Sequence, residues 1–136
     1  MKAKFLADCS IENLKAIRNF TKESIDEISL PDLEKQQIVL AVDEVCANAI
    51  IHGNKCDSSK TIEIEIKLSK NNLRVNIYNI GSLNKDKLKG PYKEMNEIIE
   101  NRQKGGMGLK IINSIMDSVK YYKKNNIHIC SLLKNL

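Results

Sequence analysis

The sequence has few aromatic residues and no long apolar run. It contains no tryptophan, two phenylalanines and four tyrosines. Its longest uninterrupted apolar stretches, such as residues 38–42 and 49–51, are far shorter than the roughly 20 residues needed to cross a bilayer. The first ten residues include Asp8 and lack the apolar core of a secretory signal. We therefore expect no membrane span and a cytoplasmic protein.

The four cysteines lack the spacing of a metal site or of a disulfide framework. They lie far apart and form no C-x-x-C pair, which is typical of proteins in a reducing compartment. A zinc site would have to join Cys46, His52 and Cys56, but a fourth ligand is missing and Cys46 shares a predicted helix face with neither partner. We therefore predict thiols without disulfides and without a structural metal.

The charge of the chain indicates an anionic partner without saying which one. The 136 residues include 22 basic and 17 acidic side chains, giving a formal charge of +5 and a pI near 9.0. Lysines are spread over the whole chain and few aromatic side chains could stack on bases, so a solvated surface explains the charge better than nucleic-acid binding. With 42% hydrophobic residues, the chain is expected to fold as a single domain over residues 1–136.

Hydrophobic periodicity predicts a strand, two helices, a hairpin, a loop, a helix and a second hairpin. The expected helices cover residues 10–28, 31–53 and 109–116, and the expected strands cover residues 4–7, 61–68, 73–77, 119–122 and 127–133. Because hairpins join antiparallel strands, these elements predict an α+β fold. It is a two-layer α/β sandwich with a mostly antiparallel sheet covered on one face by helices.

Polar residues recur on one face of the 31–53 helix. Glu44, Asn48 and His52 are spaced at i, i+4 and i+8, which aligns a carboxylate with an amide. Taken alone, this is the exposed stripe of an ordinary amphipathic helix. His52 falls in the last turn, where an imidazole can bond to the terminal carbonyls, so we assign it a structural role.

A glycine run precedes the third predicted helix. Between residues 81 and 106 the pattern is irregular except for a helical stretch at 92–101, which indicates a mobile loop or lid. Gly105, Gly106 and Gly108 then open a helix whose backbone N–H groups and positive end suit a phosphate. The run is not a P-loop because no lysine and hydroxyl residue follow it, and by itself it is equally typical of a hinge.

Two segments together resemble the motifs of the GHKL superfamily of ATPases and kinases. Residues 44–57, EVCANAIIHGNKCD, are similar to its N box, and residues 105–109, GGMGL, with the helix that follows, resemble its second glycine box. The motifs flank a hairpin in the expected order, and the resemblance covers nearly the whole chain. It points in particular to the small bacterial anti-sigma factor serine kinases, and it implies the Bergerat, or histidine-kinase-like, ATPase fold.

The resemblance implies that the chain binds ATP and Mg²⁺. Asn48 would be the metal ligand, because a neutral amide oxygen suits a hard cation. Glu44 would be the catalytic base that takes the proton from a serine hydroxyl or water. Besides Asn48, the nucleotide would be bound by Asn79, Gly81, Gly105, Gly106, Met107, Gly108 and Leu109. Arg102 and Lys104 either neutralise phosphate charge when the lid closes or lie in a solvated loop.

The first glycine box departs from the family pattern. That pattern is Asp-x-Gly-x-Gly, whereas this chain has Asn79-Ile80-Gly81-Ser82-Leu83. Asparagine keeps a carbonyl acceptor for the adenine amino group but loses the charge, which costs about 1 kcal/mol of nucleotide binding. Leu83 restricts the approach of the backbone. The threonine that often bonds the aspartate in the family is also missing.

The resemblance implies an ATP-binding anti-sigma protein with serine/threonine kinase activity toward an anti-anti-sigma partner of the STAS type. A sigma factor would be the second partner, and a homodimer is compatible with this role. A sensor histidine kinase would need a phosphoacceptor histidine on a dimerisation helix, and no histidine precedes residue 31. The degenerate glycine box leaves a second hypothesis, a weak or inactive binding module that acts by sequestering its partner. A nucleic-acid binder is the third.

Overall fold

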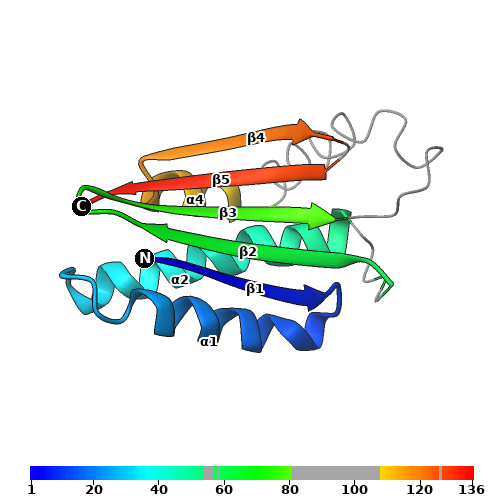
Figure 1. Ribbon diagram of the computed structural model, residues 1–136, viewed down its shortest axis with the longest axis horizontal. Coiled ribbons are helices and arrows are strands. Elements are labelled where there is room, and N and C mark those ends of the chain that lie inside the picture. The colour runs from blue at the N-terminus through cyan, green and yellow to red at the C-terminus, as the bar shows by residue number, and fades with distance from the viewer. Residues whose placement is uncertain (54–56, 58, 81–107, 126) are drawn as a thin grey trace.

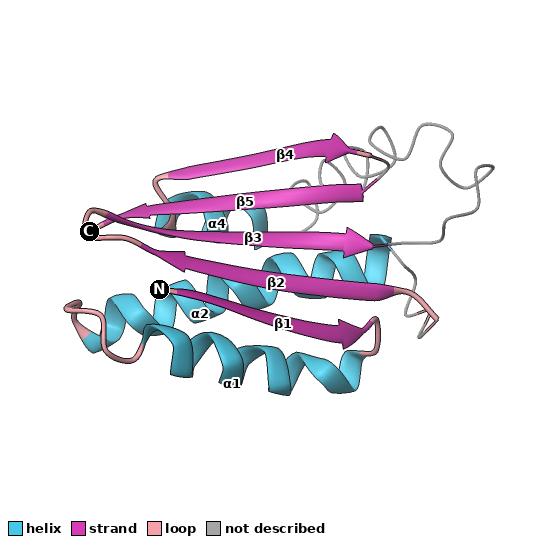
Figure 2. Cartoon of the chain, viewed as in Figure 1, coloured by secondary structure: helices cyan, strands magenta, loops and turns pink. Residues whose placement is uncertain are grey.

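The computed structural model describes residues 1–53, 57, 59–80, 108–125 and 127–136. In chain order these residues form β1 (Lys2–Asp8), η1 (Ile11–Asn13), α1 (Leu14–Ile25), α2 (Asp32–Ala47), η2 (Asn48–Gly53), β2 (Thr61–Leu68), β3 (Asn72–Ile80), α4 (Gly108–Ile115), β4 (Ser118–Lys124) and β5 (Ile127–Asn135). The strands make one layer and α1, α2 and α4 lie behind it in a second layer (Figures 1 and 2). This arrangement confirms the predicted α+β sandwich.

The five strands of the described residues form one sheet in the order β1-β2-β3-β5-β4. Every neighbouring pair is antiparallel. Both hairpins were predicted, but the pairing of β3 with β5 was not, because it joins segments far apart in the sequence. This pairing brings the end of β3 against the start of β5, with Asn79 opposite His128.

The core lies between the inner face of the sheet and α2. Ile62, Ile64 and Ile66 alternate toward the helices and are fully buried, as the pattern of apolar and charged residues predicted. Ile38 and Val42 of α2 are also inaccessible to solvent. Because burying each such side chain stabilises the fold by about 1.5–3 kcal/mol, this packing fixes α2, which carries Glu44, against the sheet.

The predicted end of the first helix was wrong, and the second helix reaches Gly53 as predicted but changes type on the way. The first helix ends at Ile25 rather than near residue 28, since the chain turns tightly there and the N–H of Ile28 bonds the carbonyl of Ile25 at 3.1 Å. Pro31 disfavours a helical conformation of the residue before it, so the chain must leave the helix by then. The second helix is not one α-helix to Gly53: α2 ends at Ala47, and η2 is a wider π-helical turn, a geometry frequent at functional sites.

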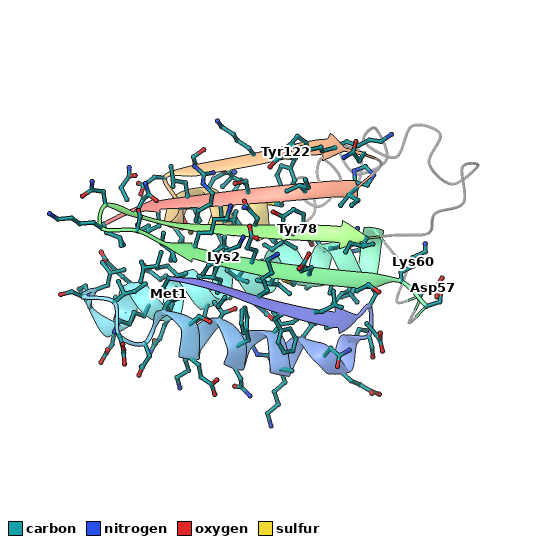
Figure 3. All side chains as sticks on the ribbon, in the orientation of Figure 1. Met1, Lys2, Asp57, Lys60, Tyr78 and Tyr122 are labelled. Carbon is teal, nitrogen blue, oxygen red and sulfur yellow. The ribbon has the colours of Figure 1, made fainter. Side chains whose placement is uncertain are left out.

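The outer face of the sheet carries a buried carboxylate. Figure 3 labels Lys2, Tyr78 and Tyr122 on the strands of this face. Glu65 is only 4% exposed and accepts hydrogen bonds from Asn76 Nδ2 at 3.2 Å and from the Tyr78 hydroxyl at 3.1 Å. Burial raises the pKa of Glu65, but these two hydrogen bonds and nearby lysines outweigh it and lower the pKa to about 2. Glu65 is therefore held as an anion.

Candidate functional site

A pocket opens between the C-terminal end of α2 and the inner side of the sheet. The space between its walls is about 430 Å³, which includes open solvent at its mouth. Its walls are mainly apolar, with a few polar groups. The lining residues are Val45, Asn48, Ala49, Ile77, Asn79, Tyr121, Tyr122, His128, Ile129 and Cys130.

Asn48 stands where α2 passes into η2. Its backbone N–H bonds the carbonyls of Glu44 and Val45, which continues the helix, and the residue lines the pocket. The residue is 6% exposed, and its Oδ1 atom accepts no hydrogen bond from any described residue. A buried acceptor without a hydrogen-bond donor lowers the stability of the fold by about 1–3 kcal/mol. The fold alone therefore gives no reason for an amide at this position.

A hard cation would give that reason. Mg²⁺ prefers oxygen ligands and is held by few protein groups together with phosphates and waters. A buried amide oxygen of a pocket-lining residue, with no competing donor among the described residues, is suited to this role. The donor chemistry at Asn48 therefore fits the implied Mg²⁺.

Glu44 and His52 differ from Asn48 in exposure. Glu44 is half-buried one turn before Asn48, whereas His52 is exposed in the last turn of η2. The three residues therefore do not form the exposed stripe that their spacing alone suggested. Of the three residues only Asn48 lines the pocket; neither Glu44 nor His52 does.

Asn79 is buried at the end of β3 and lines the same pocket. His128 and Tyr121, which line it from β5 and β4, were not predicted from the sequence. Their positions depend on the β3–β5 pairing, and the period-two pattern of one strand carries no information about its neighbour. Alternation within 127–133 would have indicated that His128 faces the core, but not that it faces Asn79.

The predicted phosphate-binding glycines are partly described. Gly108 and Leu109 open α4, whose N-terminal end faces the side of the molecule where η2 and β3 end (Figure 1). Ile112 is fully buried and fixes α4 against α2. Several predictions lie outside the described residues: the sites Gly81, Gly105, Gly106 and Met107, the neighbours Leu83, Arg102 and Lys104, and the helical stretch 92–101.

The cysteines add no candidate chemistry. Cys9, Cys46 and Cys130 are buried thiols, and Cys56 lies outside the described residues. Burial raises the pKa of Cys46 well above its usual value, with a further contribution from Asp43, so this thiol stays protonated. Within the described ranges, no three His, Cys, Asp or Glu side chains are grouped so as to hold a metal. No described helix combines the length and apolarity that a membrane crossing requires.

Comparisons with known proteins agree on one family. The profile of the histidine kinase-like ATPase domain matches residues 8–130. An anti-sigma F factor of Clostridium perfringens is 30% identical over 129 residues, which cover 93% of this chain and 88% of that protein. A serine-protein kinase RsbW of Listeria innocua is 27% identical over 129 residues, which cover 91% of this chain and 74% of that protein.

Solved structures agree at the level of the fold. The RsbU and RsbW domains of a Mycobacterium tuberculosis protein superpose with a TM-score of 0.68 at 18% identity, over 98% of this chain and 32% of that one. A chain of the SiaB–SiaC complex of Pseudomonas aeruginosa gives a TM-score of 0.61 at 15% identity, over 98% of this chain and 89% of that one. At such identities the likeness establishes the fold alone.

Proposed function

Because the chain belongs to the family of histidine kinase-like ATPase domains, we propose that it is an ATP-binding anti-sigma protein that phosphorylates an anti-anti-sigma partner of the STAS type. Phosphorylation would fall on a serine or threonine; the RsbW relatives are named serine-protein kinases. The observation that carries the nucleotide part is that Asn48 lines the pocket and that its buried Oδ1 accepts no hydrogen bond from the described residues.

Asn48 and Glu44 divide the chemistry between them. Asn48 would hold Mg²⁺ through Oδ1, and the bound ion would neutralise charge on the phosphates. Glu44, one turn earlier, would accept the proton of the partner's hydroxyl as that oxygen bonds to the γ-phosphorus and the bond to the β-phosphate oxygen breaks. The half-buried position of Glu44 suits a base that must reach a macromolecular substrate at the edge of the pocket.

The proposal includes the partners and the setting of the protein. It would act as a single domain over residues 1–136 in the cytoplasm, where it would bind a sigma factor or the anti-anti-sigma protein. A homodimer is compatible with binding these two partners in turn. The names of the anti-sigma F and RsbW relatives support the partner classes.

One observation favours a second candidate, a binding module with little or no turnover. Asn79 replaces the family's aspartate in the base-binding position, and it lines the pocket as a buried neutral amide. Weaker nucleotide binding would leave sequestration of the partner as the main activity.

Titration with Mg·ATP, followed by γ-phosphate transfer, separates the candidates. The purified protein is titrated calorimetrically and then incubated with labelled ATP and a STAS-type protein encoded by a neighbouring gene. Saturable binding with transfer supports the kinase, and saturable binding without transfer supports the module. If Mg·ATP does not bind at all, both are wrong.

A further inference from the structure

The exposed residues of α2 from Leu33 to Leu40 are all uncharged. They follow the spacing i, i+3, i+4 and i+7, which places them on one side of the helix. The two leucines are 66% and 43% exposed, so both present aliphatic surface to water. We call these residues the α2 outer patch; they are Leu33, Gln36, Gln37 and Leu40.

The neighbouring helix α1 has a different outer face. All but one of its exposed residues are charged, which is typical of a helix whose outer face stays in water. These exposed residues are Lys15, Arg18, Asn19, Lys22 and Glu23. The core of a protein interface, in contrast, is depleted in charged residues. The α2 outer patch therefore has the composition of a contact surface.

Two charged side chains beside the patch are bonded toward α1. Lys35 donates a hydrogen bond from Nζ to the backbone carbonyl of Asp26, the residue that caps α1, at 2.5 Å. Asp43 accepts a hydrogen bond from Arg18 of α1. Because both bonds draw charge away from the patch, it suits an apolar surface of another protein better than a polyanion such as a nucleic acid.

Glu44 extends the patch by one helical turn. It follows Leu40 at i+4, so the Cβ atoms of the two residues are about 5–6 Å apart. At a rise of about 1.5 Å per residue, Leu33 lies about 16 Å from Glu44 along the helix. A standard protein interface covers about 800 Å² on each partner and is therefore roughly 30 Å across. A protein that brings a hydroxyl to Glu44 thus has the extent to cover both leucines.

We propose that the α2 outer patch is the docking surface for the phosphoacceptor protein. An apolar surface of that protein covers Leu33 and Leu40, and the interface places its serine or threonine hydroxyl at Glu44. A second copy of this chain on the patch would exclude the substrate from Glu44, which favours the phosphoacceptor as the occupant. This inference rests on the proposed function, because it requires Glu44 to act on a protein substrate.

Steady-state phosphoryl transfer from ATP to the STAS-type protein encoded by a neighbouring gene tests the patch on the full chain. The double substitution Leu33→Gln and Leu40→Gln keeps the helix propensity and makes the surface polar. We expect the KM for the protein substrate to rise tenfold or more, because two apolar contacts are lost. The kcat and the dissociation constant for Mg·ATP should change less than twofold. Both leucines are exposed, so the midpoint of urea unfolding should match that of the wild type.

Leu6→Gln provides the matched control, because Leu6 is 65% exposed and lies on β1, opposite Glu63 on the outer face of the sheet. It should leave the KM unchanged. A rise of less than tenfold in the double variant overturns the inference and leaves the proposed function standing. So does sedimentation of the wild type as a dimer that the double variant dissociates, because the occupant is then a second copy. Absence of transfer by the wild type overturns the proposed kinase activity instead.

Discussion

Arg18 of α1 donates a hydrogen bond from Nη1 to Oδ1 of Asp43 in α2 at 3.1 Å. The ion pair connects the two helices at the residue that precedes Glu44. The side chains are 44% and 20% exposed, so solvent screens the attraction and its energy is small. Its effect is positional, because it helps to hold α1 against the helix that carries the candidate catalytic residues.

A double-mutant cycle measures this link. Arg18→Met, Asp43→Asn and the double variant should give a coupling free energy of about 0.2–1 kcal/mol in urea unfolding, decreasing as salt is added. Lys22→Met, on the same helix, controls for the loss of a basic side chain. A coupling that stays constant up to 1 M salt would contradict a screened ion pair.

Replacing Glu44 separates chemistry from binding. Glu44→Gln keeps the size of the side chain and removes its basicity, so phosphoryl transfer should fall by about 10²–10⁴-fold. The dissociation constant for Mg·ATP should change less than about threefold, since the carboxylate acts on the partner's hydroxyl. Transfer is measured in single turnover against binding by calorimetry. Glu34→Gln, in the first turn of the same helix, is the matched control; full activity of the Glu44 variant would exclude it as the base.

Glu65 should dominate the acid sensitivity of the fold. Because its pKa is lowered from 4.5 to about 2 in the folded protein, its stabilising effect is complete above pH 4.5 and is lost as the pH falls through about 2. The shift corresponds to about 3 kcal/mol at pH 7. Glu65→Gln should therefore unfold more easily than the wild type at pH 7, and the difference should narrow by this amount near pH 2.

Unfolding curves in urea between pH 2 and pH 7 provide the measurement. Glu63→Gln, on the same face of β2, controls for the removal of any one carboxylate from this surface. A stability difference for Glu65→Gln that stays constant with pH would show that the three neighbouring lysines, at 3.5–3.7 Å from the Glu65 carboxylate, do not favour its charged form.

Local patterns predicted the elements of this fold because their causes are local. The alternation of Ile62, Ile64 and Ile66 with charged residues defines a strand with one buried face, and Pro31 marks the start of a helix. Asn125, with φ of 51°, confirms the turn expected between the last two strands. Each of these features is decided by neighbouring residues along the chain.

The geometry of the candidate site depends on contacts between segments that lie far apart in the sequence, and no local pattern predicts such contacts. Glu44 and Asn48 were identified from their spacing and family resemblance, but the burial of Asn48 follows from how α2 packs on the sheet. His128 was missed because its place opposite Asn79 depends on the insertion of β5 between β3 and β4. The π-helical turn at residues 48–53 was not predicted either, and its cause is not evident from the residues in it.

Asn48 offers the sharpest distinction between a structural and a functional residue. If its buried Oδ1 is kept for a ligand, an apolar side chain of similar size should be tolerated in the absence of that ligand. Asn48→Leu should then have a free energy of unfolding within about 1 kcal/mol of the wild type, or higher, because a buried acceptor without a donor is removed. Binding of Mg·ATP should fall by tenfold or more.

Asn76 supplies the contrasting control. Its Oδ1 is also buried without a donor among the described residues, but its Nδ2 bonds Glu65, so Asn76→Leu leaves a buried carboxylate short of a partner. That variant should lose about 1–3 kcal/mol of stability and keep its affinity for Mg·ATP. Urea unfolding and calorimetry on the two variants give opposite results if Asn48 is a ligand. Equal losses of stability at both positions would instead make Asn48 a structural residue.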